Sequence, residues 1–334
     1  MNTISFYHIL THGELASLNS LDQALDAMHR GGYVWFDCCR ASREDLYQLA
    51  EPLGLSPLTI EDCSDQNQVP KIEDFDNYSF VIFNYLRYSN SELISDEVDI
   101  ITGKNFIVTV SAFAENSTAP LSGLEGLVRK NLLTIKSGPA YLMHLVLDNI
   151  VDNMAAPIES MEEEVDLAEE AILDSPADFD AAKLIYLRRN LLALRKSLFH
   201  EREILLKIIR NDCSFIPEKI TMHFRDIYDH ISNFFEMTES NRDNVTGLME
   251  LYASMLNNKM ARDSNQTNAS VRRLTLITTI FMPLTLIAGV FGMSEWTMMT
   301  GADRWRISYL IFFATLAVIG AASYMLLKWL ERRD

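Results

Sequence analysis

The sequence predicts an α+β membrane protein with an N-terminal α/β domain, a long helical stalk and two transmembrane helices near its C-terminal end. Three observations lead to this fold class. Residues 1–135 alternate strand-like and helix-like patterns, whereas helical patterns dominate from about Pro139 onward. Two uncharged stretches, 274–293 and 307–327, each match the roughly 20 residues that cross a bilayer core. The short loop between them makes a helical hairpin in the membrane.

The boundaries of the predicted segments follow from these changes in pattern. One helix is expected from Pro139 to Leu173, a second from Ala181 to Asn211, and a third from Glu218 to Met293, where no proline interrupts it before Pro283. The segments are an α/β cytoplasmic domain (1–135), an acidic helical hairpin (136–217), a stalk helix (218–273), a first transmembrane helix (274–293), an extracytoplasmic loop (294–306), a second transmembrane helix (307–327) and a basic cytoplasmic tail (328–334).

The N-terminal domain shows strands, helices and no catalytic motif. Helices are expected at 21–28 and 42–53, the second with a capping box between Ser42 and Asp45. Glycine-rich phosphate loops, nucleophile elbows and paired histidine motifs are missing from the sequence, which argues against an enzyme. The predicted strands are 32–39, 78–88, 97–102 and 105–110, with a two-residue hairpin turn at Gly103-Lys104.

The composition favours cations as partners. The chain has 29 basic and 46 acidic residues, a formal net charge of -17, which argues against nucleic acid and anionic lipid headgroups. Its four cysteines have no paired spacing, so they are expected to be buried thiols in a reducing compartment, and its seven histidines include no pair at helical metal-binding spacing.

Small and polar residues form one stripe along the first transmembrane segment. Their steps of four, three, four and three residues match the 3.5-residue repeat of helices that coil around one another. Such a stripe faces either neighbouring helices, where small residues permit close packing, or a water-filled axis lined by hydroxyl groups. The second segment lacks a stripe of this kind and is expected to face lipid. The stripe consists of Thr278, Met282, Thr285, Gly289 and Gly292.

Basic residues flanking the two spans orient the hairpin. They cluster before the first span and after the second, which places both termini in the cytoplasm, whereas two basic residues in the loop oppose this orientation. The expected location is a bacterial or archaeal inner (plasma) membrane. The flanking residues are Arg272, Arg273, Lys328, Arg332 and Arg333, and the loop residues are Arg304 and Arg306.

An acidic cluster marks the first long helix after the α/β domain. It is compatible with a solvated helix face and also with a reservoir that concentrates divalent cations between subunits. The cluster consists of Glu159, Glu162, Glu163, Glu164, Asp166, Glu169, Glu170 and Asp174.

Several segments resemble the CorA-type divalent cation channels, and the resemblance covers nearly the whole chain. The most specific are 252–258 and 274–293, which look like the stalk and pore helix of that family; 70–78, 188–196 and 224–230 support them. The resemblance implies a homopentameric funnel in the membrane, with divalent cations as cargo rather than a resident cofactor. It implies that the pore is lined by Asn268, Val271, Leu274, Thr278, Met282, Thr285, Gly289 and Gly292.

The chain departs from the family pattern directly after the pore helix. The family has Gly-Met-Asn there, whereas this chain has Gly292-Met293-Ser294. An asparagine offers a carbonyl and an amide to the water shell of Mg²⁺, while serine offers one short hydroxyl. The resemblance implies magnesium as the first cargo, with cobalt and nickel as passengers. Because of Ser294, zinc, as in the related ZntB-like branch, is the alternative. Glu295 and Asp303 complete the expected selectivity loop.

Two further departures concern regulation and spacing. In magnesium channels of this family, a stalk aspartate and a carboxylate of the neighbouring N-terminal domain bind inhibitory Mg²⁺. Asp226 matches the stalk aspartate. The position of the other carboxylate falls near Ser89, and Glu92 or Asp96 could substitute for it. An apparent insertion of about seven residues, one heptad, lies around residues 260–268, before the pore. A hypothesis from another class is a metal-responsive membrane scaffold whose hairpin anchors without conducting.

Overall fold

A computed structural model describes residues 3–65, 68–113, 119–291 and 305–330. The chain divides into two compact units, Met1–Tyr252 and Ala253–Asp334.

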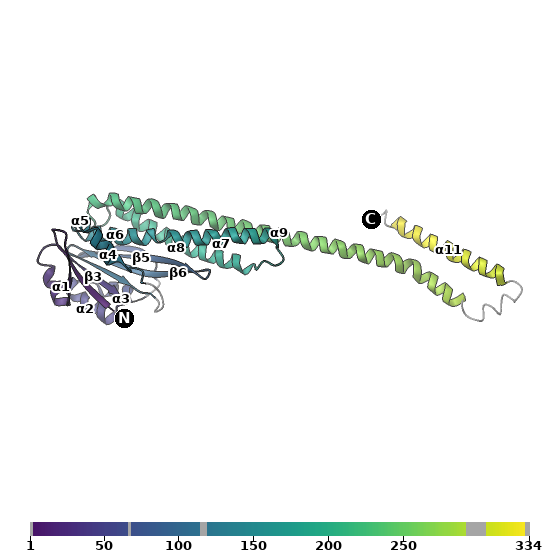
Figure 1. Ribbon diagram of the computed structural model, residues 1–334, viewed down its shortest axis with the longest axis horizontal. Helices are drawn as coiled ribbons and strands as arrows, with labels where there is room; N and C mark the ends of the chain where they lie inside the picture. The colour runs from purple at the N-terminus through teal and green to yellow at the C-terminus, as the bar shows by residue number, and fades with distance from the viewer. Residues whose placement is uncertain (1–2, 66–67, 114–118, 292–304, 331–334) are drawn as a thin grey trace. The chain divides into compact units, whose positions relative to one another are not determined.

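A seven-stranded mixed sheet forms the centre of the first unit (Figure 1). Its strand order is β2-β1-β3-β7-β6-β5-β4, and β3 and β7 are its parallel neighbours, while the other pairs are antiparallel. The predicted strands correspond to β3, β5, β6 and β7, whereas β1, β2 and β4 were not predicted. The strands are β1 (Thr3–Ile9), β2 (Leu15–Leu18), β3 (Tyr33–Cys39), β4 (Lys71–Asp74), β5 (Tyr78–Ser89), β6 (Glu92–Gly103) and β7 (Phe106–Ser111).

Helices cover both faces of this sheet, which gives three layers (Figure 1). On one face α1 (Leu21–Ala27), α2 (Arg43–Leu53) and α3 (Pro57–Ser64) enclose a core that includes Phe36 and Phe80. On the other face α6 (Pro139–Asp152), α7 (Ala155–Asp174) and α8 (Ala182–Ile209) pack against β5, β6 and β7. Two short helices, α4 (Leu124–Lys130) and α5 (Leu132–Ile135), lead into α6.

Local signals set the ends of the N-terminal helices. The Ser42 hydroxyl accepts a hydrogen bond from the Asp45 backbone N–H, and Asp45 Oδ2 accepts one from the Ser42 backbone N–H at 3.0 Å. This reciprocal pair is the predicted capping box, which satisfies two amides that have no partner within the helix. Ser20 caps α1 through one hydrogen bond, which its hydroxyl accepts from the N–H of Gln23.

Two hairpin turns join β5, β6 and β7. Asn90 and Ser91 link β5 to β6 with φ values of 53° and 60°, as the tight turn favoured between twisted strands requires. The second turn lies one residue later than predicted, because β6 extends through Gly103 and β7 begins at Phe106. A side chain at Gly103 would overlap the Phe106 ring, so glycine permits the close approach of the two strands.

The segment expected to form one helix from Pro139 to Leu173 forms two, α6 and α7. The break falls between Asp152 and Ala155. Pro157 explains this break, because a proline ring in a continuous helix would clash with the carbonyl of Asn153, four residues earlier. The prediction was therefore wrong at this point.

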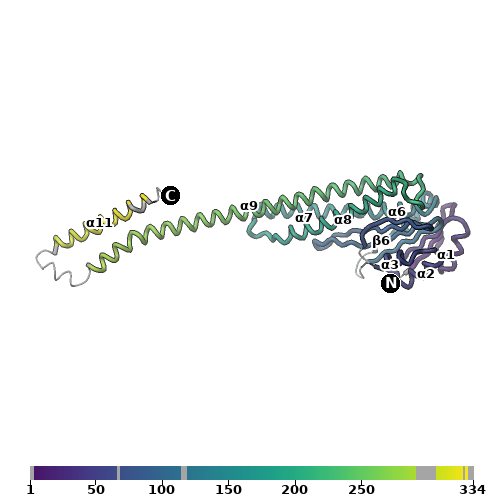
Figure 2. Tube along the Cα trace, turned by 180° about the vertical axis from the view of Figure 1, so that it is seen from behind, coloured from purple at the N-terminus to yellow at the C-terminus, as the bar shows by residue number. Residues whose placement is uncertain are grey.

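The long helix α9 (Glu218–Phe291) begins in the first unit, where it lies beside α7 and α8 (Figures 1 and 2). Arg195 on α8 is paired with Glu239 on α9, and the guanidinium of Arg202 lies 4.6 Å from the centre of the Phe235 ring. An ion pair and a cation–π contact thus join the two helices. The predicted uninterrupted helix is confirmed as far as Phe291.

The second unit consists, in its described part, of the remainder of α9 and of α11 (Trp305–Leu330). Within the described residues, both helices contain a stretch that is long and apolar enough to cross a membrane. No described residue in the apolar window of either helix is fully buried by the rest of the chain. An unburied apolar helix of this length is expected in lipid rather than in water.

Candidate functional site

The polar stripe of α9 lies opposite the side that contacts α11. A methyl group on Gly320 of α11 would lie 3.7 Å from Leu284 Cδ1 of α9, an ordinary packing distance. Leu276, Ile280 and Ile287, on the same side of α9 as Leu284, are partly covered. In contrast, Thr278, Met282, Thr285 and Gly289 are all exposed within the chain.

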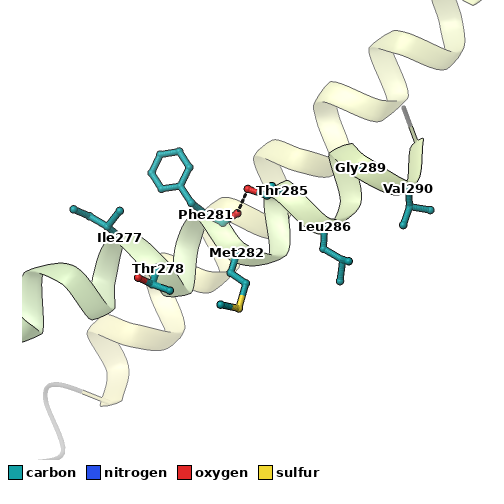
Figure 3. Close-up of a pocket in the computed structure, with 8 residues that line it drawn as sticks. All are labelled: Ile277, Thr278, Phe281, Met282, Thr285, Leu286, Gly289 and Val290. Carbon is teal, nitrogen blue, oxygen red and sulfur yellow. Dashed lines mark hydrogen bonds between the residues drawn. The ribbon is translucent and has the colours of Figure 1, made fainter. Parts of the chain in front are cut away.

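These four exposed residues contribute to a broad, open hollow of about 710 Å³ on the surface of α9 (Figure 3). Figure 3 shows Met282, Leu286 and Val290 projecting from one side of the helix, while Phe281 projects from another. The predicted stripe therefore has apolar side chains on its flanks and small or polar groups along its length. The complete lining is Ile277, Thr278, Phe281, Met282, Thr285, Leu286, Gly289 and Val290.

Each threonine hydroxyl of the stripe donates a hydrogen bond to a backbone carbonyl. Thr278 Oγ1 donates to the Leu274 carbonyl at 2.9 Å, and Thr285 Oγ1 donates to the Phe281 carbonyl at 2.7 Å. Each hydroxyl oxygen retains lone pairs that can accept a hydrogen bond from the water shell of a cation. The hydrogen bonds also satisfy the hydroxyl donors, which would be costly to leave unpaired in lipid.

The remaining predicted pore residues within the described chain extend this stripe toward the first unit. Asn268, Val271 and Leu274 are exposed residues of α9. At 3.6 residues per turn, they and the stripe fall within about 120° around the helix axis. The structure thus brings seven of the eight predicted pore residues onto one side of α9. Gly292, Met293, Ser294, Glu295 and Asp303 lie outside the described residues.

The predicted regulatory residue, Asp226, lies on the first unit's part of α9 and faces α6. Burial raises the pKa of the Asp148 carboxyl on α6, and the charges of Asp152 and Asp226 raise it further. His144 on α6 also lies within the electrostatic influence of Asp226. The sequence analysis missed both α6 residues, because no local signal indicates which helix packs against Asp226.

The candidate partners of Asp226 lie at the β5–β6 hairpin instead. Ser89 and Glu92 are paired across that hairpin and both are exposed. Asp96 accepts hydrogen bonds from Arg87, with an Nε–Oδ2 distance of 2.8 Å. Asp96 therefore already forms an ion pair with a guanidinium.

One member of the acidic cluster on α7 has a structural contact. Glu164 accepts hydrogen bonds from Tyr88 Oη at 2.8 Å and from Ser91 Oγ at 2.9 Å, which attaches α7 to the β5–β6 hairpin. The other seven acidic residues of the cluster are exposed. Among the described residues, no group of three or more histidine, cysteine, aspartate or glutamate side chains is arranged to hold a metal ion.

Residues 30–332 match the family described as CorA-like Mg2+ transporter protein. The chain belongs to this family. The cobalt/magnesium transport protein CorA of Thermotoga maritima is 33% identical over 299 residues, which are 88% of this chain and 82% of that protein. The chain is therefore a divalent cation transporter of the CorA family.

Solved structures agree with this fold. The complete structure of the CorA magnesium transporter from Methanocaldococcus jannaschii matches with a TM-score of 0.69 at 20% identity, covering 100% of this chain and 98% of that one. The ZntB cytoplasmic domain from Vibrio parahaemolyticus matches with a TM-score of 0.58 at 12% identity, covering 79% of this chain and 100% of that one. At these identities the likeness concerns the fold. The expected CorA-type architecture of an α/β domain, a long helix and C-terminal apolar helices is confirmed.

Proposed function

We propose that the protein is a homopentameric channel that conducts Mg²⁺, with Co²⁺ and Ni²⁺ as accompanying ions. The name of the Thermotoga maritima relative supports cobalt and magnesium as cargo. The net charge of -17 favours cation attraction. The excess of basic residues at the outer ends of the hairpin supports an inner-membrane location with both termini in the cytoplasm.

The observation that carries this proposal is the exposed polar side of α9 opposite α11. Five copies that placed this side on a common axis would line a pore with rings of Thr278 and Thr285 hydroxyls. Mg²⁺ loses its water shell reluctantly, so hydroxyl rings that accept hydrogen bonds from that shell suit a hydrated ion. The exposed Val271 and Leu274 side chains would form the apolar constriction on the cytoplasmic side, which can close by excluding water.

Zinc is the second candidate cargo because of the sequence Gly292-Met293-Ser294. Serine offers fewer hydrogen-bonding groups than asparagine for holding the water shell of Mg²⁺ at the outer mouth. Weaker retention of that shell would reduce the preference for Mg²⁺. The substitution Ser294→Asn tests this idea. If Ser294 sets selectivity, the variant should have a higher ratio of Mg²⁺ flux to Zn²⁺ flux than the parent.

Gating is proposed to depend on Asp226. The carboxylate is exposed on α9, where a Mg²⁺ ion held between it and a carboxylate of a neighbouring subunit would stabilise a closed pore. High cytoplasmic Mg²⁺ would then stop its own entry.

The experiment is cation flux into proteoliposomes that contain the purified protein, with magnesium-sensitive and zinc-sensitive dyes in parallel samples. Magnesium flux supports the primary proposal. Zinc flux without magnesium flux would replace it with zinc transport, and flux of neither ion would favour a metal-responsive scaffold. Empty liposomes with the same lipids provide the leak control.

A further inference from the structure

Two histidines face each other between α6 and α9 in the first unit. The ring centres of His144 and His223 are 5.4 Å apart, and their planes make an angle of 66°. Phe224 packs edge-on against the His144 ring at 5.4 Å, and Tyr141 lies 6.1 Å from the His223 ring. Aromatic neighbours thus hold two imidazoles close together on different helices.

The spacing of the two rings matches that of imidazoles sharing one metal ion. A zinc–nitrogen bond is about 2.0–2.1 Å long, so two imidazoles at tetrahedral positions on one ion have ring centres roughly 5 Å apart. The observed distance of 5.4 Å is close to this value.

The His144 ring is half-buried, and the His223 ring is exposed. In a metal site each imidazole binds the ion through one ring nitrogen, and the other nitrogen can hydrogen-bond to a neighbouring group, which fixes the tautomer.

Two carboxylates add negative charge beside the imidazole pair. Asp148 follows His144 by four residues on α6, and Asp226 follows His223 by three on α9, so each lies one helical turn further along the same side. Burial raises the pKa of Asp148 most, and the charges of Asp152 and Asp226 raise it further, because like charges repel. A bound dication would relieve this repulsion.

We propose that His144 and His223 form a binding site for a transition-metal dication of the Zn²⁺, Co²⁺ and Ni²⁺ class in the first unit. Imidazole nitrogen suits these ions, whereas Mg²⁺ prefers oxygen ligands. With two protein ligands, the site leaves coordination positions for water, as in an exchangeable site. It lies outside the polar stripe of α9, so it does not depend on which ion the pore conducts.

Co²⁺ is the probe, because X-ray absorption distinguishes imidazole from carboxylate ligands. The full-length protein in detergent is titrated with Co²⁺ by calorimetry, with Mg²⁺ in excess. The variants are His144→Gln and His223→Gln, and His200→Gln on α8 is the matched control. Each of the two site variants is expected to weaken Co²⁺ binding by about tenfold or more and to remove imidazole scattering, since even the loss of a supporting group costs 10–100-fold.

Three results would overturn the proposal: Co²⁺ affinities of the site variants equal to that of the parent, displacement of Co²⁺ by Mg²⁺, or loss of Co²⁺ binding in Asp226→Asn together with its retention in both histidine variants. The last result would assign the bound ion to a carboxylate site. His223 is exposed, so His223→Gln decides the test if the more buried His144→Gln alters folding. Because binding is measured without flux, failure of transport leaves this test intact.

Discussion

Glu201 is a fully buried carboxyl on α8, in the first unit. Its Oε1 accepts hydrogen bonds from the Asn84 backbone N–H at 3.2 Å and from Ser197 Oγ at 3.0 Å, while Oε2 has no partner. Burial raises the pKa of Glu201 from 4.5 to about 8, although both hydrogen bonds lower it. The folded protein therefore retains a proton on this side chain at neutral pH.

Glu201 should make the stability of the first unit depend on pH. In the unfolded chain the carboxyl ionises near pH 4.5, whereas in the folded chain it ionises near pH 8. Its contribution to the free energy of unfolding is therefore complete below pH 4.5 and is lost as the pH rises toward 8. The Glu201→Gln side chain is neutral at every pH. The free energy of unfolding of this variant should therefore rise relative to that of the parent by about 1.4 kcal/mol for each pH unit in this window. Denaturant unfolding at several pH values measures the difference; parallel stability curves would contradict it.

Asp226 should control the response of the channel to Mg²⁺. If Mg²⁺ bound at this carboxylate holds the pore closed, Asp226→Ala should conduct at Mg²⁺ concentrations that close the parent, because the closed state loses its ligand. Flux is measured in proteoliposomes at increasing internal Mg²⁺. Asp229→Ala, also exposed on α9 and one turn further along, is the control, and identical inhibition of Asp226→Ala and the parent would refute the assignment.

At the scale of single elements, the capping box of α2 makes a measurable contribution. Ser42→Ala removes the hydroxyl that accepts from the Asp45 N–H, and such a loss typically destabilises by about 1 kcal/mol. The midpoint of denaturant unfolding of the first unit should decrease accordingly. Ser17→Ala, at an exposed strand position that caps no helix, should leave it nearly unchanged. Equal effects of the two substitutions would argue against a capping contribution.

The exposed carboxylates of α7 should behave as a solvated helix face. Replacing Glu162, Glu163, Glu169 and Glu170 with glutamine should slightly stabilise the metal-free protein, since like charges one turn apart repel. The Mg²⁺ dependence of thermal unfolding should remain that of the parent. A smaller Mg²⁺ dependence in the variant would instead indicate that these carboxylates collect divalent cations.

Local patterns in the sequence predict individual elements well. The Ser42 capping box, the branched and aromatic runs of β3 and β5, and the helical spacing from Glu218 onward each depend on neighbours in the chain. The polar stripe of α9 was equally visible, because a helix converts regular spacing into one side.

Tertiary contacts were harder to predict. The break at Pro157 depends on a clash with a carbonyl four residues earlier, and a single proline near a helix start is also compatible with continuation. The β1 strand is stabilised by pairing with β3, which is distant in sequence, and β2 is stabilised by pairing with β1. His144 and Asp148 gain significance from the packing of α6 against α9, which no spacing within α6 reveals.

At the scale of the whole molecule, the proposed channel function requires that the polar stripe of α9 face the permeating ion. Thr278 and Thr279 provide a matched comparison within one turn. Thr278 is exposed on the polar stripe, whereas Thr279, about 100° further around the helix, is partly covered. Cysteine is close in size to threonine, so both replacements should preserve the fold.

The most direct test is Mg²⁺ flux into proteoliposomes of Thr278→Cys and Thr279→Cys after treatment with a positively charged methanethiosulfonate reagent. The parent serves as background, since its cysteines are buried or half-buried in the first unit. If the polar stripe lines the pore, the reagent should block flux in Thr278→Cys and leave Thr279→Cys and the parent unchanged. Block of Thr279→Cys alone, or unchanged flux in both variants, would contradict the proposed pore.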